Sequence, residues 1–271
     1  MRPFEPSSVM VAPPHWRNID FISDLHLQAS EPLTFEAWRR YMRTTRADAV
    51  FILGDLFEVW VGDDAAGDER ASSFEGQCAT VLQHTAARMP VFFMHGNRDF
   101  LVGPAFMVRC QCTLLADPTV LDFGGQRWLL SHGDELCLAD TDYLKFRVMV
   151  RSASWQQDFL AKPLDERKAI ARDLRTRSEA KKQTAATYAD VDAQAALAWL
   201  RGAGARHMMH GHTHKPANHL LGPDLHRIVL SDWEMSAQPP RAEVLRLSIE
   251  DATAPQAPPG VSMKRIAVDS A

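Results

Sequence analysis

Acidic, amide and imidazole side chains follow five separate apolar stretches of this sequence. The five stretches, each with the polar residues that end it, are 19–26, 49–55, 91–97, 128–132 and 206–212. In open α/β sheets, ligands bind beyond the carboxyl ends of the strands. Five strand ends that carry oxygen and imidazole donors therefore predict a shared site for metal ions.

Asp55 is the residue around which this prediction is built. Residues 49–53 are apolar at every position, which is typical of a strand covered on both faces, and the strand breaks at Gly54. A single Gly-Asp pair is most often an ordinary turn, so the argument depends on the recurrence of the pattern along the chain. We predict that Asp55 bridges two metal ions.

Seven side chains are candidate metal ligands, three offering oxygen and four offering nitrogen: Asp24, His26, Asp55, Asn97, His132, His210 and His212. A set without thiolates suits Mn²⁺, Fe²⁺ or Zn²⁺ better than Ca²⁺ or a structural zinc. Seven donors are too many for one four-coordinate ion. They fit two ions about 3.5–4 Å apart, which can clamp a phosphoryl group and supply hydroxide for its hydrolysis.

Neighbouring residues add detail to this prediction. Asp24 and His26 are two apart, so an extended backbone would point both toward one ion. Arg98 offers a planar fork for phosphate oxygens beside Asn97. Asp63 and Asp64 are interpreted as loop-shaping residues, because Gly-Asp-Asp is also good turn chemistry. The remaining seven histidines are not counted as ligands, and His95 and His214 are the first two to reconsider.

Strands and helices alternate in the predicted order along the chain. Apolar periodicity predicts strands at 19–23, 49–53, 91–95, 206–210, 225–231 and 242–249, helices at 34–46, 71–89 and 192–201, and a hairpin of 113–122 with 127–131. We expect a core of 19–137 and 191–250, an insertion at 138–190, a disordered extension at 1–18 and a tail at 251–271.

The insertion at 138–190 mixes apolar and basic residues in helix-forming sequence. One interpretation is a solvated helical hairpin, because a basic helix face is usually just that. The other is a cap over the metals, with cations facing a phosphorylated substrate and apolar faces toward its greasy part. The residues alone leave both open.

Composition narrows the class of protein. The 271 residues are 46% hydrophobic and 24% charged, with 30 Lys and Arg against 34 Asp and Glu, so no basic field argues for nucleic acid. The four cysteines lack zinc-site spacing and are expected to be reduced thiols of a cytosolic protein. No apolar run approaches the roughly 18 residues of a membrane span, so we expect only peripheral membrane contact.

The motifs resemble those of the calcineurin-like metallophosphoesterase superfamily. They are Asp24-Leu-His26, Gly54-Asp55, Gly96-Asn97, His132 and His210-Gly-His212, within a resemblance that covers about residues 19–232. This resemblance implies an α/β fold, a four-layer αββα sandwich with a helical cap insertion and both metals at the carboxyl ends of the strands.

A narrower resemblance follows from Arg98, which stands where many superfamily members have His. With the sequence of 54–64 and the insertion, it is similar to the family of UDP-2,3-diacylglucosamine diphosphatases of lipid A biosynthesis. That resemblance implies Mn²⁺-dependent attack of water at the α phosphate, giving UMP and 2,3-diacylglucosamine 1-phosphate. It also implies a peripheral enzyme at the cytoplasmic face of a Gram-negative inner membrane, and we favour a monomer.

The same resemblance assigns the site residues. One ion would be held by Asp24, His26, Asp55 and His212, and the other by Asp55, Asn97, His132 and His210. The catalytic group comprises Asp55, Asn97, Arg98 and His210, of which the last three also contact substrate. Cap positions that match substrate contacts are Asp140, Ser178, Lys181 and Lys182, with the role of each lysine left open by a departure in spacing at 181–184.

Two alternatives remain. One is another phosphoesterase on the same metals, such as a nucleotide diphosphatase, a phosphatase or a nuclease. The other is a non-catalytic interaction scaffold, which is disfavoured because none of the seven ligands is missing.

Overall fold

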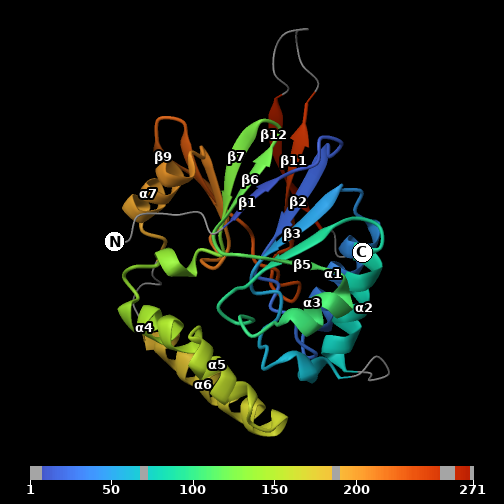
Figure 1. Cartoon of the computed structure of the whole chain (residues 1–271), viewed down its shortest axis with the longest axis vertical. Helices are drawn as coiled ribbons and strands as arrows, with labels where there is room; N and C mark the ends of the chain where they lie inside the picture. The colour runs from blue at the N-terminus through green and yellow to red at the C-terminus, as the bar shows by residue number, and fades with distance from the viewer. Residues whose placement is uncertain (1–7, 68–72, 185–189, 251–259, 269–271) are drawn as a thin grey trace.

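Two six-stranded sheets pack face to face, with helices on their outer faces (Figure 1). The computed structural model describes residues 8–67, 73–184, 190–250 and 260–268, and within these the side chains of 177–184 are not described. The expected four-layer αββα arrangement is confirmed by the two sheets and by the helices that cover them.

One sheet carries the first three predicted metal loops. Its order is β12(Val261–Ala267), β11(Glu243–Ile249), β2(Asn18–Ile22), β3(Ala49–Leu53), β4(Val91–Met94) and β5(Thr113–Leu115). Strands β2 to β5 pair in parallel, whereas β11 and β12 run antiparallel. Parallel pairing places the carboxyl ends of β2, β3 and β4 at one edge, so the loops that follow them are neighbours.

The other sheet carries the remaining metal loops. Its order is β1(Ser8–Val11), β6(Thr119–Phe123), β7(Gln126–Leu130), β8(His207–His210), β10(Leu225–Val229) and β9(Ala217–Gly222). Strands β7 and β8 are parallel neighbours, so His132 and His210 emerge side by side.

Strand β3 shows how the layers are assembled. Val50 and Ile52 face the helices α1(Pro32–Thr44), α2(Phe74–Ala86) and α3(Pro104–Cys110). Phe51 and Leu53 face the other sheet, where Phe51 stacks between Phe21 and Phe92 at centroid distances of 5.0 and 4.7 Å. Helix α7(Ala193–Ala203) covers the outer face of the second sheet. A strand apolar at every position is thus buried on both faces, as predicted.

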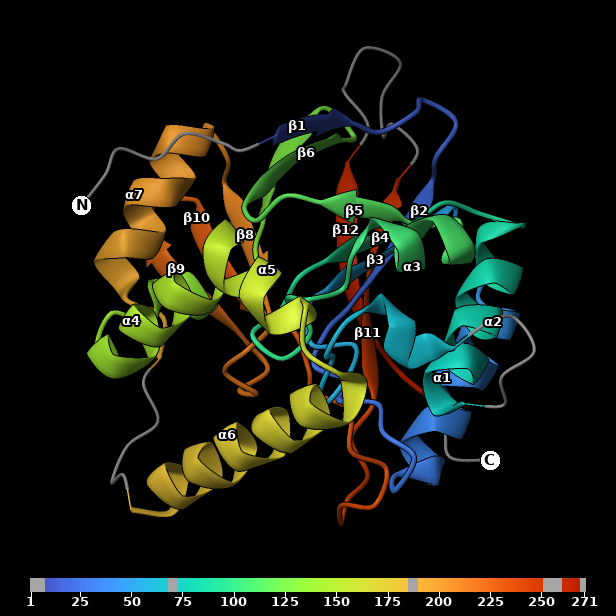
Figure 2. The ribbon, with the colours of Figure 1, turned by 60° about the horizontal axis from the view of Figure 1, so that its bottom comes forward.

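The insertion forms an arm of three helices, α4(Thr141–Val150), α5(Ala153–Leu160) and α6(Leu164–Thr184). Figure 2 shows α6 as a long rod apart from the helices that cover the sheets. Two short 3₁₀ helices, η1(Asp63–Ala66) and η2(Asp134–Leu136), lie in the loops after β3 and β7. No helix in the described ranges has the length and apolar character needed to cross a bilayer.

Both predicted terminal segments are corrected where the structure describes them. Residues 8–11 of the extension expected to be disordered form β1, which pairs with β6, and Trp16 is buried between the sheets. Residues 261–267 of the expected tail form β12, which pairs with β11. Both are edge strands. The partner of β1 lies more than 100 residues along the chain, as in the pair Ser8 and Thr119, whereas β12 pairs with the preceding strand β11. Residues 1–7, 251–259 and 269–271 lie outside the described ranges.

The predicted hairpin is also corrected in part. Strands β6 and β7 do form a hairpin around Gly124 and Gly125, both with positive φ. The segment 113–122, however, is two strands in different sheets. The break comes at Pro118, which has no amide hydrogen to continue a strand. Strand β9 was not anticipated from the sequence.

Candidate metal centre

The backbone of the metal loops adopts an unusual conformation. Five residues there have left-handed φ values, which few side chains tolerate: Asp24, His26, Asp55, His212 and His214. Each such residue costs about 1–3 kcal/mol and persists only where surrounding structure enforces it. The expected extended backbone at Asp24 and His26 is therefore wrong, since their φ angles are 54° and 49°.

Glycines allow these loops to approach one another closely. A Cβ on Gly96 would overlap Asp55 Oδ1 and lie 2.8 Å or less from three atoms of that residue. A Cβ on Gly211 would overlap Ser23 Oγ and Asp24 Oδ2. Both positions therefore require glycine because a neighbouring backbone and carboxylate occupy the space of a side chain.

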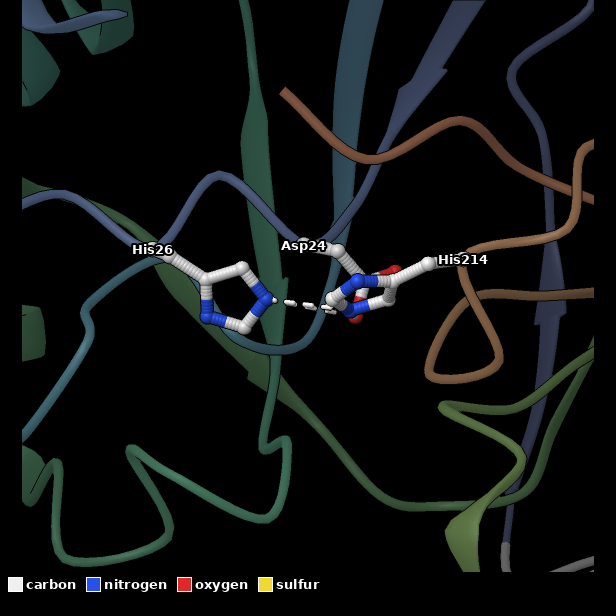
Figure 3. A group of neighbouring side chains, drawn as sticks. All are labelled: Asp24, His26 and His214. Atoms are coloured by element: carbon white, nitrogen blue, oxygen red, sulfur yellow. Dashed lines mark hydrogen bonds and ion pairs between the residues drawn. The ribbon is translucent and has the colours of Figure 1, made fainter. Parts of the chain in front are cut away.

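Asp24 lies at the centre of the first group of donors. Its carboxylate is fully buried and accepts the backbone N–H of His212 at 3.0 and 2.9 Å. Figure 3 shows the rings of His26 and His214 pointing toward each other beside it, with their Nε2 atoms 3.1 Å apart. Asp24 Oδ1 lies 3.4 Å from His214 Nε2 and 4.0 Å from His26 Nε2. One carboxylate and two ring nitrogens so arranged can hold a divalent cation.

The groups around Asp24 favour the ionised form of its carboxylate. Burial raises the pKa of Asp24, but its hydrogen bond to His214 and the nearby His132 and His26 together bring that pKa well below its usual range. Asp24 is therefore ionised and can act as a metal ligand.

Asp55 forms a second group with His132 and Asn97. Its Oδ2 lies 3.7 Å from His132 Nε2, and its Oδ1 accepts the backbone N–H of Arg98 at 2.9 Å. His132 Nδ1 lies 2.9 Å from the carbonyl oxygen of Leu53, to which it donates. This bond directs Nε2 toward Asp55 Oδ2 and Asn97 Oδ1, the latter 3.0 Å away.

The groups around His132 Nε2 would stabilise a cation. Burial lowers the pKa of His132, but the charges of Asp55, Asp24 and Asp134 raise it to about 9. The pocket thus attracts positive charge at a ring nitrogen surrounded by oxygen acceptors. Asp24, Asp55 and His132 each place a ligand atom within 4.8 Å of the others, so a metal ion would supply the charge that a proton supplies here.

His210 and His212 are the last two predicted ligands, and neither belongs to the two groups of described residues whose ligand atoms lie within 4.8 Å of one another. His210 Nδ1 lies 2.8 Å from the carbonyl oxygen of Gly211, whereas its buried Nε2 has no hydrogen-bond partner among the described residues. His212 Nδ1 lies 2.8 Å from Asn97 Oδ1. Burial lowers the pKa of His210 to about 3, and burial together with His132 lowers that of His212 to about 4. Neutral imidazoles are the form that binds metals, so the donor set fits divalent ions.

The structure also shows donors and supports that sequence reasoning missed. His214 lies with Asp24 and His26, and its sequence signal was its place in His-Gly-His-Thr-His. Asp99 accepts the backbone N–H groups of Gly96 and Leu56 at 2.8 and 2.7 Å, and so ties the loop after β4 to the loop after β3. His95 is the other histidine to reconsider. Its Nε2 donates to the carbonyl oxygen of Val102 at 2.7 Å, which is a local structural role.

Arg98 lies beside the second group. Its Nε is 3.4 Å from Asp55 Oδ2, and its Nη1 donates to Glu58 Oε1 at 2.6 Å. The side chain is 9% exposed, so the guanidinium lies largely shielded from water next to the donors. A phosphate bound over the metals would lie within reach of this fork.

Asp63 and Asp64 shape their loop, as expected. Asp63 accepts the backbone N–H groups of Gly103 and Phe106 at 2.8 and 2.9 Å, at the start of α3. Asp64 pairs with Arg167 of α6. Neither carboxylate lies with the donor groups.

The arm of α4 to α6 contacts the donor loops through basic residues. Arg151 donates to the carbonyl oxygen of Gly96 at 2.9 Å and lies over the ring of Phe100 at 5.8 Å. Arg167 is buried against the loop after β3, where it also bonds the carbonyl oxygen of Val61. These contacts favour the cap interpretation of the insertion over a solvated hairpin.

Of the four predicted substrate contacts in the cap, the structure describes the side chain of Asp140 only. Asp140 caps the start of α4 by accepting the backbone N–H of Tyr143 at 3.1 Å, which is a structural role in its own right. Ser178, Lys181 and Lys182 belong to α6, and their side chains lie outside the described part of the chain. Their proposed contacts therefore stay predictions.

Comparison with known proteins identifies the class of this site. The family model of calcineurin-like phosphoesterases matches residues 17–216, a range that includes all seven predicted ligands. The chain belongs to the calcineurin-like phosphoesterases. Among solved structures, it is similar to Vps29 from Chaetomium thermophilum with a TM-score of 0.45 and 9% identity, over 92% of this chain and 97% of that one.

The similarity to curated proteins points to one family within this class. The chain is 46% identical to UDP-2,3-diacylglucosamine hydrolase of Chromobacterium violaceum, over 79% of this chain and 90% of that protein. It is 42% identical to the protein of the same name in Cellvibrio japonicus, over 80% and 91% of the two chains. Within the calcineurin-like phosphoesterases, the chain therefore belongs to the family of UDP-2,3-diacylglucosamine hydrolases.

Proposed function

We propose that this protein hydrolyses the pyrophosphate bond of UDP-2,3-diacylglucosamine, with water attacking the α phosphate. The products would be UMP and 2,3-diacylglucosamine 1-phosphate, and the reaction would serve lipid A biosynthesis. The observation that carries the proposal is the meeting of carboxylates and imidazoles from four loops, and of the Asn97 amide from a fifth, beside Arg98 and a basic cap. The name shared by its relatives supports the choice of substrate.

The donor set would hold two divalent ions. Asp24, His26, Asp55 and His212 would hold one, and Asp55, Asn97, His132 and His210 the other. Such a pair of ions polarises phosphate oxygens and brings the pKa of water toward neutrality. We propose Mn²⁺ for both positions, because mixed carboxylate and imidazole ligands without thiolates suit this metal. His214, which lies 3.4 Å from Asp24 Oδ1, is the residue that could replace His212 at the first ion.

Arg98 would neutralise the negative charge that develops in this reaction. Cleavage at the α phosphate releases a sugar 1-phosphate, which leaves as a stable anion and needs charge neutralisation more than a proton. A guanidinium supplies that charge at every physiological pH. This accounts for an arginine at the position where many superfamily members have histidine.

The cap would bind the rest of the substrate. Exposed apolar side chains on α4 and α5, namely Val148, Met149 and Leu160, are 72%, 49% and 42% exposed. With the neighbouring arginines they suit contact with a lipid surface that carries anionic head groups. We propose a peripheral, monomeric enzyme at the cytoplasmic face of the inner membrane, where an acylated substrate would reside.

One labelling experiment tests the proposed bond cleavage. The purified protein, supplied with Mn²⁺ and UDP-2,3-diacylglucosamine in ¹⁸O water, should place the label in UMP. Label in the sugar phosphate would contradict attack at the α phosphate. Turnover of simple phosphomonoesters without turnover of this substrate would instead favour a general phosphatase on the same metals.

A further inference from the structure

Glu58 brings together three parts of the molecule that the proposed reaction uses separately. Its Oε2 lies 3.3 Å from Nδ1 of His26, a predicted metal ligand. Its Oε1 accepts Nη1 of Arg98 at 2.6 Å and also pairs with Arg175 of the cap helix α6. One carboxylate thus faces a metal ligand, a phosphate-binding arginine and the cap at once.

The backbone fixes Glu58 in this position. Leu27 and Phe57 form a β-bridge, and the N–H of Glu58 donates to the carbonyl oxygen of Leu27 at 3.2 Å. One step earlier, the N–H of His26 donates to the carbonyl oxygen of Asp55 at 3.0 Å. The segments that carry His26 and Glu58 therefore run side by side, and the contact of the two side chains follows from this pairing.

The contact with His26 determines how that ring can serve a metal. Nε2 faces Asp24, whereas the buried Nδ1 has no aligned hydrogen bond in the described structure, and Glu58 is the acceptor within its reach. Ligating histidines usually direct their other ring N–H at a carboxylate, which fixes the tautomer and the ring orientation. Glu58 stands in that position behind His26.

The contact with the two arginines has a different consequence. Arg98 and Arg175 converge on one oxygen of Glu58, which holds two guanidinium groups close together at the edge of the metal site. Each group retains donors that can bind a phosphate oxygen. An anion bound there would share both guanidinium groups with Glu58, so binding of a phosphate and placement of α6 are linked through this carboxylate.

Ordinary surface pairing does not describe this arrangement. Exposed ion pairs contribute about 0–1 kcal/mol, because solvent screens them. Here the side chains of Glu58, Arg98 and His26 are only 17%, 9% and 15% exposed. The contacts of Glu58 with His26 and Arg98 are therefore largely shielded from the screening that weakens surface pairs.

We infer that Glu58 is a positioning residue that orients His26 for the metal and couples the cap helix α6, through Arg175 and Arg98, to phosphate binding. This inference rests on the proposed function for the identity of the phosphate, but its metal-binding half does not depend on the substrate.

The test compares three single variants, and the double variant of Glu58→Gln with Arg175→Ala, with the wild-type enzyme. Glu58→Gln keeps the shape of the side chain and removes its charge. Arg175→Ala removes the partner that the cap offers to Glu58. Glu166→Gln is the matched control, because Glu166 lies on the same helix α6 and its ion pair among the described residues is an exposed one with Lys162. Mn²⁺ affinity is measured by calorimetry on metal-free protein, and kcat and KM are measured with UDP-2,3-diacylglucosamine and, separately, with bis(4-nitrophenyl) phosphate.

We expect Glu58→Gln to weaken Mn²⁺ binding by at least about tenfold, which is the usual effect of losing a carboxylate behind a ligating histidine. Arg175→Ala should keep wild-type Mn²⁺ affinity and raise KM for the sugar nucleotide. In the double variant, KM should rise by less than the product of the two single effects, because both act through one contact. Glu166→Gln should leave all these quantities unchanged.

Wild-type Mn²⁺ affinity in folded Glu58→Gln, or multiplicative effects on KM, would overturn the inference. If Glu58→Gln does not fold, a loss of Mn²⁺ affinity in Arg175→Ala would overturn it, while retained affinity with a raised KM would support it. A wild-type enzyme that cleaves only bis(4-nitrophenyl) phosphate would contradict the proposed substrate, yet the Mn²⁺ measurement would still decide the role of Glu58.

Discussion

The donor loops and the cap contribute to one site in opposite ways. The donor loops are buried, and five of their residues have left-handed φ angles. They leave no room for a Cβ at Gly96 or Gly211. The cap meets them through long basic side chains, such as Arg151 and Arg167, and keeps apolar residues exposed. Backbone geometry therefore fixes the donor loops, whereas the cap contacts them through side chains, and we expect the cap to be the part that adjusts to the substrate.

The largest effect should follow from a single methyl group in the donor loops. In Gly96→Ala, the new Cβ would overlap Asp55 Oδ1, so the predicted bridging carboxylate must move. We expect Mn²⁺ affinity and kcat/KM to fall by more than about 100-fold, since changes behind metal ligands already cost 10- to 100-fold. Gly222→Ala is the control, because the nearest atoms there are 3.9 Å away. Retention of activity within tenfold in Gly96→Ala would remove the claim of a rigid centre.

Arg98→Ala should separate chemistry from metal binding. The guanidinium lies beside Asp55 but is not a predicted metal ligand, so both ions should still bind. We expect kcat to fall by roughly 10²- to 10³-fold, the usual cost of removing one group that stabilises transition-state charge. Steady-state kinetics and metal analysis of the same preparation check this expectation. Equal losses of metal and activity would mean that Arg98 supports the centre and has no separate role in the reaction.

Loosening the cap should have an intermediate effect. Arg167→Ala removes bonds to the carbonyl oxygens of Val61 and Lys162 and the pair with Asp64. We expect the free energy of unfolding to fall by about 1–3 kcal/mol, because buried polar partners are left without bonds. KM should rise, while Mn²⁺ affinity should stay constant. Lys168→Ala, at an exposed neighbouring position, serves as the control for denaturant unfolding and kinetics. A fall in Mn²⁺ affinity would show that the two regions are not separable.

The smallest effects are expected for the two cap lysines. An exposed cation that meets a phosphate contributes about 0.2–1 kcal/mol, which corresponds to a change of up to about fivefold in KM. One of Lys181→Ala and Lys182→Ala should show this increase without a change in kcat, and the other should behave as wild type. Parallel kinetics on the two variants identify the contacting lysine. A large fall in kcat in either would place that lysine in the reactive centre instead.

The positions of Asp55 and Asn97 are predictable from the sequence because each follows a strand that is apolar at every position. Residues 49–53 and 91–94 carry this pattern, and the parallel pairing of β3 and β4 then brings Asp55 and Asn97 together. The left-handed φ at Asp24 and His26 was missed because the same residue types also occur in ordinary turns and extended loops.

Features that depend on distant pairing were beyond the reach of the sequence. Strand β1 is an edge that joins β6, far along the chain, so no local pattern marks it. Glu58 and Asp99 stand next to predicted site residues, but their roles come from how loops pack and not from spacing. His214 is one of the two histidines that the sequence marks for reconsideration, and its place beside Asp24 and His26 depends on how the loops pack.

Anomalous diffraction from crystals of the protein grown with Mn²⁺ tests the central claim most directly. The account predicts two manganese peaks per chain with the carboxylate of Asp55 between them. His26 and His212 should bind one ion, and Asn97, His132 and His210 the other. A single peak held by Asp24, His26 and His214, with Asp55 bound to no metal, would contradict it.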